Sequence, residues 1–385
     1  MTSVAEPALG RMERRLLAVG DDRPGPLPPL DPAQLIGLAR DSGLTGRGGA
    51  GFPIWRKLSA VGPNATVIAN AAEGEPASAK DRTLLTHRPH LVLDGLQLAA
   101  RATGATAAHF YGPADTVDRI RTLLTQRRDP LPVIAHTAPD AFVAGEESAV
   151  RNAVAGRPAV PSDKRIRITE GAAPTLVQNV ETLAHLALIA RHGPGWFRSA
   201  GTPDEPGTFL ATVSGAVARP GVVEAGYGVR LGELISAVGG PTGDLAAVLV
   251  GGYHGGWVPA DPALPVSRRE LARFGSSPGA GVILALPVGA CGLAETARIA
   301  GYLADQVAGQ CGPCVNGLPR MAWTLTDLAN RRPKPGLAAE VDRLARLVQG
   351  RGACRHPDGT ARLVLSALAT FAADVTAHLN GRCRA

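Results

Sequence analysis

The sequence has 385 residues, enough for two or three domains, and a formal net charge of +7. Only four of its 40 basic residues are lysine, and no dense basic run carries interleaved aromatic residues, which argues against nucleic-acid binding. No apolar run reaches the length of a membrane span and the N-terminus lacks a signal pattern, so we expect a cytoplasmic protein without direct membrane insertion.

The first half of the chain predicts an arm followed by an α/β domain. Residues 1–32 end in the proline-rich segment DDRPGPLPPL, which is typical of an extended arm. From 33 to 204 strands alternate with helices, which indicates an α/β domain. The expected elements are a helix at 32–44, a glycine-rich loop at 44–52, a short helix from 53, a strand at 65–70, a loop at 71–82, a helix at 89–105, a strand at 107–112, a helix at 114–128, a short strand running into a helix at 140–157, and a helix at 174–193.

Two smaller domains are expected after it. Residues 205–288 contain two strands around a turn at ARPG, then a helix and a further strand, which together predict a β-grasp (ubiquitin-like) domain. Residues 289–385 carry four segments with helical spacing and therefore predict a C-terminal four-helix bundle.

The glycine-rich loop is the first candidate binding site. Gly46, Gly48 and Gly51 satisfy the dinucleotide pattern G-x-G-x-x-G, and Gly49 adds a fourth glycine. The element before the loop has helical spacing, however, and a Rossmann fold requires a strand there. The glycines still allow a flat or phosphorylated ligand to approach the main chain, and Lys57 adds a positive charge.

Polar residues near the ends of other predicted elements could converge on the same place. Three such groups follow a strand or open a helix, where α/β sheets bind ligands. Each group taken alone is equally well explained by helix caps and solvated turns. The residues are Asn70, Glu73 and Glu75, then Glu146 and Glu147, then Asn179 and Thr182.

All five cysteines lie in the last 95 residues, at positions 291, 311, 314, 354 and 383. Cys311 and Cys314 form a C-x-x-C pair, which in an intracellular chain indicates a metal or redox site before a disulfide framework. The alternative is that these are simply buried apolar thiols.

Five motifs resemble one family in their order along the chain. GRGGAGFPxxxK, NAxExEP…KDR, GEESA…GRP, NVETL and CxPCxxGLP are similar to the flavin-carrying, NADH-oxidising subunit of respiratory complex I and of related hydrogenases and formate dehydrogenases. The resemblance extends over roughly residues 32–379. It implies a first domain for FMN and NADH, a β-grasp domain that binds a soluble ligand, and a helical domain with a 4Fe–4S cluster.

The resemblance also implies roles for single residues. FMN or nicotinamide contacts are expected from Gly46, Gly48, Gly49, Gly51, Phe52, Lys57, Asn70, Glu73, Phe142, Gly145, Glu146, Glu147, Asn179 and Thr182. Glu75 and Lys164 are expected at the reactive edge of the flavin as catalytic residues. Cys311, Cys314 and Cys354 are expected to be cluster ligands.

The chain departs from the family pattern at four positions. Ala72 replaces an aspartate that contacts the flavin, and Ala60 and Arg167 replace aromatic residues that bracket the dinucleotide. Since stacking on an aromatic face contributes about 1–3 kcal/mol, NADH is expected to bind less tightly than in the family. Ala308 stands where the first of four cluster cysteines is expected.

The missing fourth thiol leaves several outcomes open. A helix of about 16 residues, or about 24 Å, separates Cys291 from Ala308 and excludes it as a substitute. Cys383 is a further candidate for the fourth thiol. The three-cysteine site could carry a three-iron cluster, a cubane with a water or side-chain ligand, or no metal.

Three hypotheses about function follow. The first is a flavoprotein oxidoreductase that passes electrons from NAD(P)H through FMN to an iron–sulfur centre and a partner electron-transfer subunit, in the cytoplasm or at the periphery of a membrane complex. In the second, FMN exchanges electrons with ferredoxin or a membrane reductase without NADH. The third is a scaffold that has lost its cofactors and only binds partner proteins.

Overall fold

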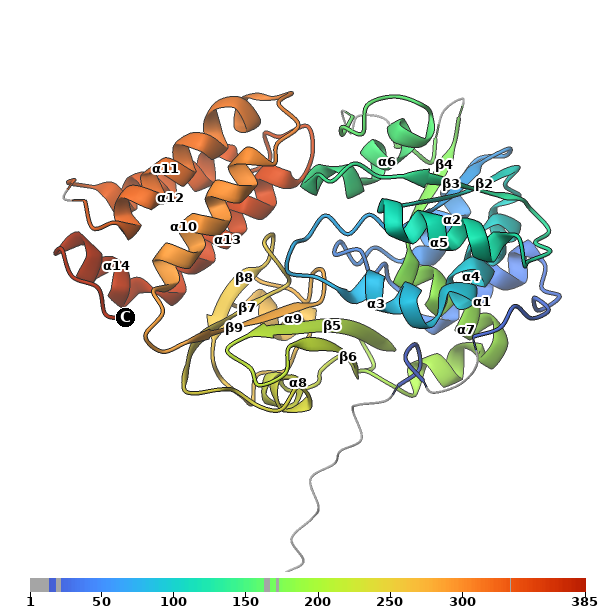
Figure 1. Ribbon diagram of the computed structural model, residues 1–385, viewed down its shortest axis with the longest axis horizontal. Helices are drawn as coiled ribbons and strands as arrows, with labels where there is room; N and C mark the ends of the chain where they lie inside the picture. Colours follow the sequence, from blue (N-terminus) through green and yellow to red (C-terminus); the bar gives the residue numbers. More distant parts are fainter. Residues whose placement is uncertain (1–13, 19–21, 163–166, 171–172, 333) are drawn as a thin grey trace, which may run out of the picture.

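The computed structural model describes residues 14–18, 22–162, 167–170, 173–332 and 334–385. An α/β part, a five-stranded sheet and a group of helices lie side by side, from the right of the view through the lower centre to the left (Figure 1). Most of the expected arm, residues 1–13 and 19–21, lies outside the described residues, and residues 22–31 form neither helix nor strand.

A parallel sheet forms the centre of the α/β part, with strand order β3-β2-β1-β4. Its middle strands are buried on both faces, as parallel strands usually are. Val67 packs toward α4 and α7, while the next residue, Ile68, packs on the opposite face beside Val150 of α6. The strands are β1 (Thr66–Asn70), β2 (Ala107–Gly112), β3 (Val133–Thr137) and β4 (Thr175–Asn179).

Helices cover the sheet because most of them have one apolar face, and α4 is buried nearly all round. Pro89 opens α4 and Gly104, in the left-handed conformation, ends it. The helices are α1 (Pro32–Ser42), α2 (Ile54–Ala60), α3 (Lys80–His87), α4 (Pro89–Thr103), α5 (Ala114–Leu124), α6 (Glu147–Val154) and α7 (Val180–Arg198), with a short 3-10 turn η1 (Phe142–Gly145).

Three expectations for this part were wrong in detail. The segment from 174 does not begin as a helix, because its apolar run TLVQN pairs in parallel with β1 as β4, and the helix starts only at Val180. The expected strand before α6 is the 3-10 turn η1. The expected loop at 71–82 also contains the start of α3, which no apolar periodicity announces.

A mixed sheet of order β6-β5-β9-β7-β8 follows, with α8 packed against its core. The hairpin, the helix and the next strand occur where the sequence predicts them. The elements are β5 (Thr208–Gly215), β6 (Gly221–Gly226), α8 (Leu231–Ala237), β7 (Leu245–Val250), β8 (Gly256–Pro259), α9 (Arg268–Ala272) and β9 (Val282–Pro287).

The last part consists of helices around a common apolar core. The final expected helix is broken at Phe371, whose ring packs against Trp257 at 5.2 Å between centroids, and the two pieces bend by 80°. No single described helix is long and apolar enough to cross a membrane; the bent pair α13 and α14 passes that test together, by length and composition alone. The helices are α10 (Gly292–Asp305), α11 (Leu318–Ala329), α12 (Leu337–Val348), α13 (His356–Thr370) and α14 (Ala372–Leu379), with a π turn η2 (Pro313–Gly317) before α11.

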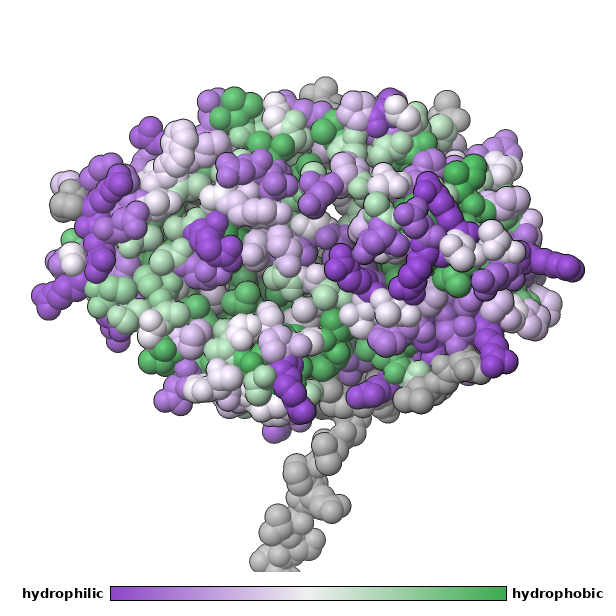
Figure 2. Space-filling model, viewed as in Figure 1, coloured by the Kyte–Doolittle hydropathy of each residue, from purple (hydrophilic) through white to green (hydrophobic). Residues whose placement is uncertain are grey.

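Hydrogen bonds join the three parts. The backbone N–H groups of Arg15, Leu16 and Leu17 donate to the buried carboxylate of Glu224 on β6 at 2.8–2.9 Å. The N–H of Phe142 donates to Gln306, just after α10, at 3.0 Å. Strongly hydrophilic residues gather on the α/β side and along the outer edge of the helical part, and paler, more apolar residues lie between them (Figure 2).

Candidate functional site

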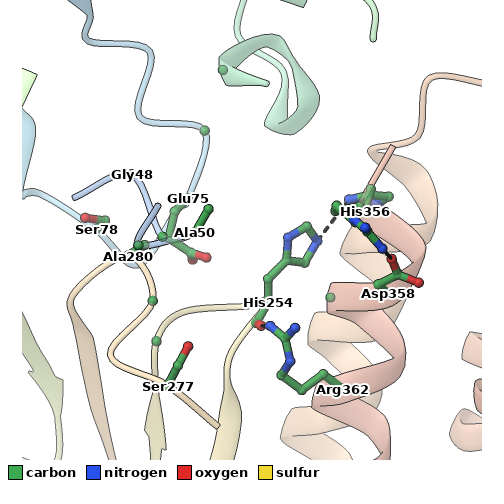
Figure 3. A pocket seen from close by; sticks show the side chains of 18 of the residues that line it. Gly48, Ala50, Glu75, Ser78, His254, Ser277, Ala280, His356, Asp358 and Arg362 are labelled. Atoms are coloured by element: carbon green, nitrogen blue, oxygen red, sulfur yellow. Dashed lines mark hydrogen bonds and ion pairs between the residues drawn. The ribbon is translucent and has the colours of Figure 1, made fainter. Parts of the chain in front are cut away.

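A cavity of about 1560 Å³ lies where the three parts meet. Its walls come from the glycine-rich loop and strand ends of the α/β part, from the loops around 251 and 277–280, and from the start of α13 (Figure 3). This volume exceeds that of an ordinary small-molecule pocket. All the predicted flavin-site residues that the structure describes line it, together with Glu75 and Cys354.

The glycine-rich loop is fixed at both ends. The N–H of Gly46 donates to the carbonyl of Phe52 at 2.9 Å, and the N–H of Arg47 donates to Thr182 Oγ1 on α7 at 2.8 Å. Gly49 (φ 107°) and Gly51 (φ 63°) adopt the left-handed region, which favours glycine. Part of the glycine pattern is therefore explained by backbone geometry alone.

Gly46 and Gly48 are not explained in that way. A Cβ built on Gly46 would come no closer than 3.7 Å to the atoms around it, and one on Gly48 would meet only Asn179 Cβ at 3.4 Å. Both residues line the cavity, so an added methyl group would project into empty space rather than clash with protein. This cradle fits a flat group such as a flavin lying against bare main chain.

Lys57 reaches from α2 to the other wall. Its Nζ lies 3.0 Å from Glu147 Oε2 and 3.5 Å from the carbonyl oxygen of Val177. The side chains of Lys57 and Glu147 are 22% and 37% exposed, so their charges stay accessible from the cavity. The lysine that the sequence places after the glycine loop is thus a cation at the cavity wall.

The carboxyl ends of β1 and β4 bring two asparagines together. Asn70 and Asn179 are paired in register in the sheet. Asn70 donates to the carbonyl of Gly145 at 2.9 Å, while Asn179 caps α7 by accepting from the N–H of Glu181 at 3.1 Å. The misassigned strand β4 is therefore the element that places Asn179 opposite Asn70.

Several predicted ligand residues also act as caps. Glu146 caps α6 by accepting from the N–H groups of Ser148 and Ala149. Glu73 accepts from the hydroxyl of Ser78 and from the N–H of Asp81 at the start of α3. The capping alternative raised by the sequence is thus correct for these side chains, and the same residues still form the cavity wall.

Glu75 is a buried carboxyl group at the cavity wall with a raised pKa. Burial raises its pKa from 4.5 to about 7, against the lowering effect of the N–H groups of Tyr253 and Ala77. Those donors lie 2.6 Å and 3.2 Å from its carboxylate oxygens. A carboxyl group with this pKa exchanges a proton near neutral pH.

A buried charge cluster behind the cavity was not predicted as such. Lys80 Nζ lies 2.6 Å from Asp81 Oδ1, 2.9 Å from Glu181 Oε2 and 3.3 Å from Asn179 Oδ1. Lys80, Asp81 and Glu181 are each no more than 3% exposed. The scarcity of lysine and the motifs KDR and NVETL singled out these residues, but nothing in the sequence showed that they meet.

Aromatic and imidazole rings connect the flavin side of the cavity to the cysteine loop. Phe142 lies 4.7 Å from His254 and 5.4 Å from His356 between ring centroids. His254 Nε2 and His356 Nδ1 are 3.1 Å apart, and His356 follows Cys354 by two residues (Figure 3). Burial lowers the pKa of both histidines, so both rings are neutral at pH 7.

Three cysteines gather at the edge of the helical part. Cys311 Sγ and Cys314 Sγ are 3.3 Å apart, and Cys354 lies near enough to raise the pKa of the Cys314 thiol, after the larger effect of burial. Burial opposes ionisation of Cys311 too, but N–H groups of Ala353 and Cys314 lower the pKa of its thiol overall. The donor set supplies three of the four thiolates that a cubane ordinarily takes.

The structure also places the other residues considered as cluster ligands. Ala308 lies in the loop after α10, and α10 is unbroken, as expected when Cys291 was excluded as a cluster ligand. Cys383 contacts Cys291 and not the three-cysteine site.

The expected nucleotide-binding positions differ in where they lie. Ala60 and Arg167 are exposed and do not line the cavity, whereas Phe52, 44% exposed, does. Lys164 lies outside the described residues.

Three protein families match successive parts of the chain. The Nuo51 FMN-binding domain matches residues 39–188, the SLBB domain matches residues 210–255, and the NADH-ubiquinone oxidoreductase-F iron–sulfur binding region matches residues 294–378. The three matches fall on the α/β part, the mixed sheet and the helices.

Whole-chain relatives agree with these matches. The second F-type subunit of NADH-quinone oxidoreductase of Rhizobium meliloti (strain 1021) is 30% identical over 91% of this chain and 90% of its own length. The NADP-reducing hydrogenase subunit HndC of Solidesulfovibrio fructosivorans is 28% identical over 92% of this chain and 77% of its own length.

A solved structure shares the fold. The air-oxidised NAD+-reducing NiFe-hydrogenase contains a chain with a TM-score of 0.83 and 32% identity, covering 91% of this chain. The present chain spans only 63% of that hydrogenase chain. From the fold, the cavity and these matches together, the chain belongs to the family of F-type subunits of NADH-quinone oxidoreductase.

Proposed function

We propose that the protein is an oxidoreductase subunit that passes electrons from NAD(P)H through FMN to an iron–sulfur centre and then to a partner protein. One observation carries the proposal: a single cavity is lined both by the glycine cradle and by Cys354. A flavin held in the cradle and a centre held by the cysteine loop would therefore face the same space.

FMN, when bound, supplies the ability to take two electrons from a nicotinamide and release them one at a time. The protein's own residues hold and orient it. Gly46 and Gly48 leave room against the main chain, and Lys57 supplies positive charge. Thr182, in the first turn of α7, lies at the positive end of a helix dipole.

Glu75 is proposed to hold a proton at the far side of the cradle. Its carboxyl group lines the cavity and has a pKa of about 7, so it can hold or release a proton at neutral pH. Lys164 stays a proposal from the resemblance alone. Phe52 offers an exposed ring on which a nicotinamide or adenine could stack.

The domain limits are likewise proposed from the pattern of elements. We assign FMN and NAD binding to 33–204, a soluble-ligand-binding β-grasp domain to 205–288, and an iron–sulfur-binding helical bundle to 289–385. The family matches at 39–188, 210–255 and 294–378 each fall inside one of these ranges and support them.

A partner subunit is proposed because the relatives are named as subunits. Val315, next to Cys314 on η2, and Trp323 on α11 are 58% and 70% exposed. These side chains offer an apolar surface where a partner could dock near the cysteines. The NADH-quinone oxidoreductase relative supports NADH as donor, the two hydrogenases are named as reducing NADP or NAD+, and none of the three supports ferredoxin.

Anaerobic flavin reduction tests the proposal. Protein reconstituted with FMN should lose its flavin absorption band when NADH or NADPH is added, and the electrons should then appear in the iron–sulfur centre by EPR. Stoichiometric FMN that does not bleach with either nucleotide would contradict the proposed donor. A protein that binds no FMN would favour the scaffold hypothesis instead.

A further inference from the structure

A second group of metal-ligating side chains lies outside the site described so far. Cys291 caps α10, His378 lies near the end of α14, and Cys383 follows that helix. The two Sγ atoms and one imidazole nitrogen all lie within 4.8 Å of one another. In Figure 1 the end of the chain lies beside the loop that enters α10.

The spacing of the ligand atoms matches tetrahedral zinc. Cys291 Sγ and His378 Nε2 are 3.5 Å apart. With Zn–S of about 2.3 Å and Zn–N of about 2.0–2.1 Å, two ligands on a tetrahedral ion are separated by about 3.6 Å. None of the five cysteines is in a disulfide, so both thiols are available as ligands.

The histidine is held in the orientation that a metal requires. His378 is only 2% exposed, and its Nδ1 lies 3.1 Å from the carbonyl oxygen of Leu328. Because a carbonyl only accepts, Nδ1 carries the proton and Nε2 presents its lone pair to the two thiols. A backbone carbonyl behind a ligating histidine is a common outer contact in metal sites.

Cys291 is the N-cap residue of the 14-residue helix α10, is half-buried, and has its Sγ beside His378. Burial raises the pKa of its thiol, and a coordinated Zn²⁺ would still remove the proton. Cys383 contacts Cys291 from the segment after α14, so the set joins two distant parts of the chain.

This set is separate from the iron–sulfur site. The helix α10, about 21 Å long, lies between Cys291 and the loop that contains Ala308 and Cys311. We propose that Cys291, His378 and Cys383 bind a zinc ion, with the fourth position open to solvent because both cysteines are partly exposed. Zinc has no redox chemistry, so the ion fastens the segment after α14 to the start of α10 rather than carrying electrons.

Zinc counting on variants tests the proposal. The chain as purified without chelator should hold about one zinc beyond any iron, and Cys383→Ser should lose it, because two ligands bind far more weakly than three. Arg384→Ser is the matched control in the same segment and should keep the zinc. Cys314→Ser tests whether zinc has entered the iron–sulfur site, and it too should keep the zinc. Cobalt bound in place of zinc should give thiolate charge-transfer absorption in the parent protein and not in Cys383→Ser.

Two outcomes would overturn the proposal. One is a disulfide between Cys291 and Cys383, found by mass spectrometry of the unreduced protein. The other is zinc that stays in Cys383→Ser and leaves in Cys314→Ser. FMN content measured on the same samples should not change with Cys383→Ser, which keeps this result independent of the redox function and shows that the variant is folded.

Discussion

The glycines of the loop at 46–51 are there for different reasons. Gly49 and Gly51 have positive φ, so their place in the sequence is set by the backbone. Gly46 and Gly48 have free space where a Cβ would stand, and that space is part of the cavity. Only the second pair is therefore expected to affect ligand binding without affecting folding.

Gly48→Ala tests this distinction. The added methyl group would occupy the cradle and cost about 1–3 kcal/mol of binding, or roughly 5–150-fold in the Kd for FMN, while the Tm of the FMN-free protein should not change. Gly301→Ala is the matched control, since a Cβ there meets nothing within 4 Å and Gly301 lies away from the cavity. An unchanged Kd for FMN in Gly48→Ala, measured by fluorescence titration, would mean that FMN does not lie against the main chain at Gly48.

Glu75 should make stability depend on pH. Its pKa is about 7 when folded and about 4.5 when unfolded, so the folded state binds the extra proton between these values. The stabilisation is complete below about pH 4.5 and is lost as the pH rises through 7. Glu75→Gln should therefore gain stability over the parent as the pH rises.

Each pH unit between the two pKa values contributes about 1.4 kcal/mol, so the gap between Glu75→Gln and the parent should reach ~1–3 kcal/mol by about pH 8. Thermal unfolding of the FMN-free proteins from about pH 5 to about pH 8 measures it. Parallel pH profiles for the two proteins would mean that the Glu75 carboxyl group titrates normally.

At the scale of elements, the sequence predicted those with a clear period and missed those set by tertiary contacts. The helix α4 and the strand β2 occur where expected, because one is a long apolar helix pattern and the other a short buried run. The strand β4 was merged with α7 because TLVQN continues into VETLAHL with no glycine or proline between them. Its pairing with β1, which no local pattern encodes, makes it a strand.

The residues of the site divide in the same way, into those that sequence motifs predict and those that come together only on folding. The residues of the glycine loop and the acidic loops could be predicted from motifs, and the structure brings all the described ones to one cavity. The buried charge cluster behind the cavity could not be predicted, because Lys80, Asp81 and Glu181 meet only after α3 and α7 pack together. The motifs KDR and NVETL and the rarity of lysine singled these residues out one by one, but not as a cluster.

Lys80→Met should be strongly destabilising. It would remove the cation paired with Asp81 and Glu181 and leave only the charge of Arg47 acting on Glu181, and breaking a buried ion pair costs roughly 3–5 kcal/mol. Lys334→Met is the control, because its partner Asp327 pairs with it at the surface. Urea unfolding should show a lower midpoint for Lys80→Met only; equal midpoints would mean that the cluster stays satisfied without the lysine.

Ala308→Cys tests the loop between α10 and η2. It restores a thiol where the family resemblance expects one, so anaerobically reconstituted protein should approach about four irons per chain, with fewer in the parent. Ala329→Cys, a partly buried alanine at the end of α11, controls for an added thiol elsewhere. The same iron count in the parent and Ala308→Cys would show that the three native cysteines hold the complete cluster.

At the scale of the whole molecule, the cavity depends on all three parts. The glycine cradle belongs to the α/β part, Glu75 is held by the N–H of Tyr253 beside the mixed sheet, and Cys354 precedes α13. No single part encloses the space. This is why the motifs, scattered over more than 300 residues, could be found one by one in the sequence while the cavity they share could not.

The carboxylate of Glu224 has a practical consequence. It is 3% exposed, and besides Thr208 its partners include the amides of residues 15–17. A recombinant protein begun after residue 18 would leave this acid in an apolar interior with fewer donors, a situation that destabilises proteins. Expression vectors that trim the leading residues to aid crystallisation would then loosen the mixed sheet from its neighbour, far from the site of the cut.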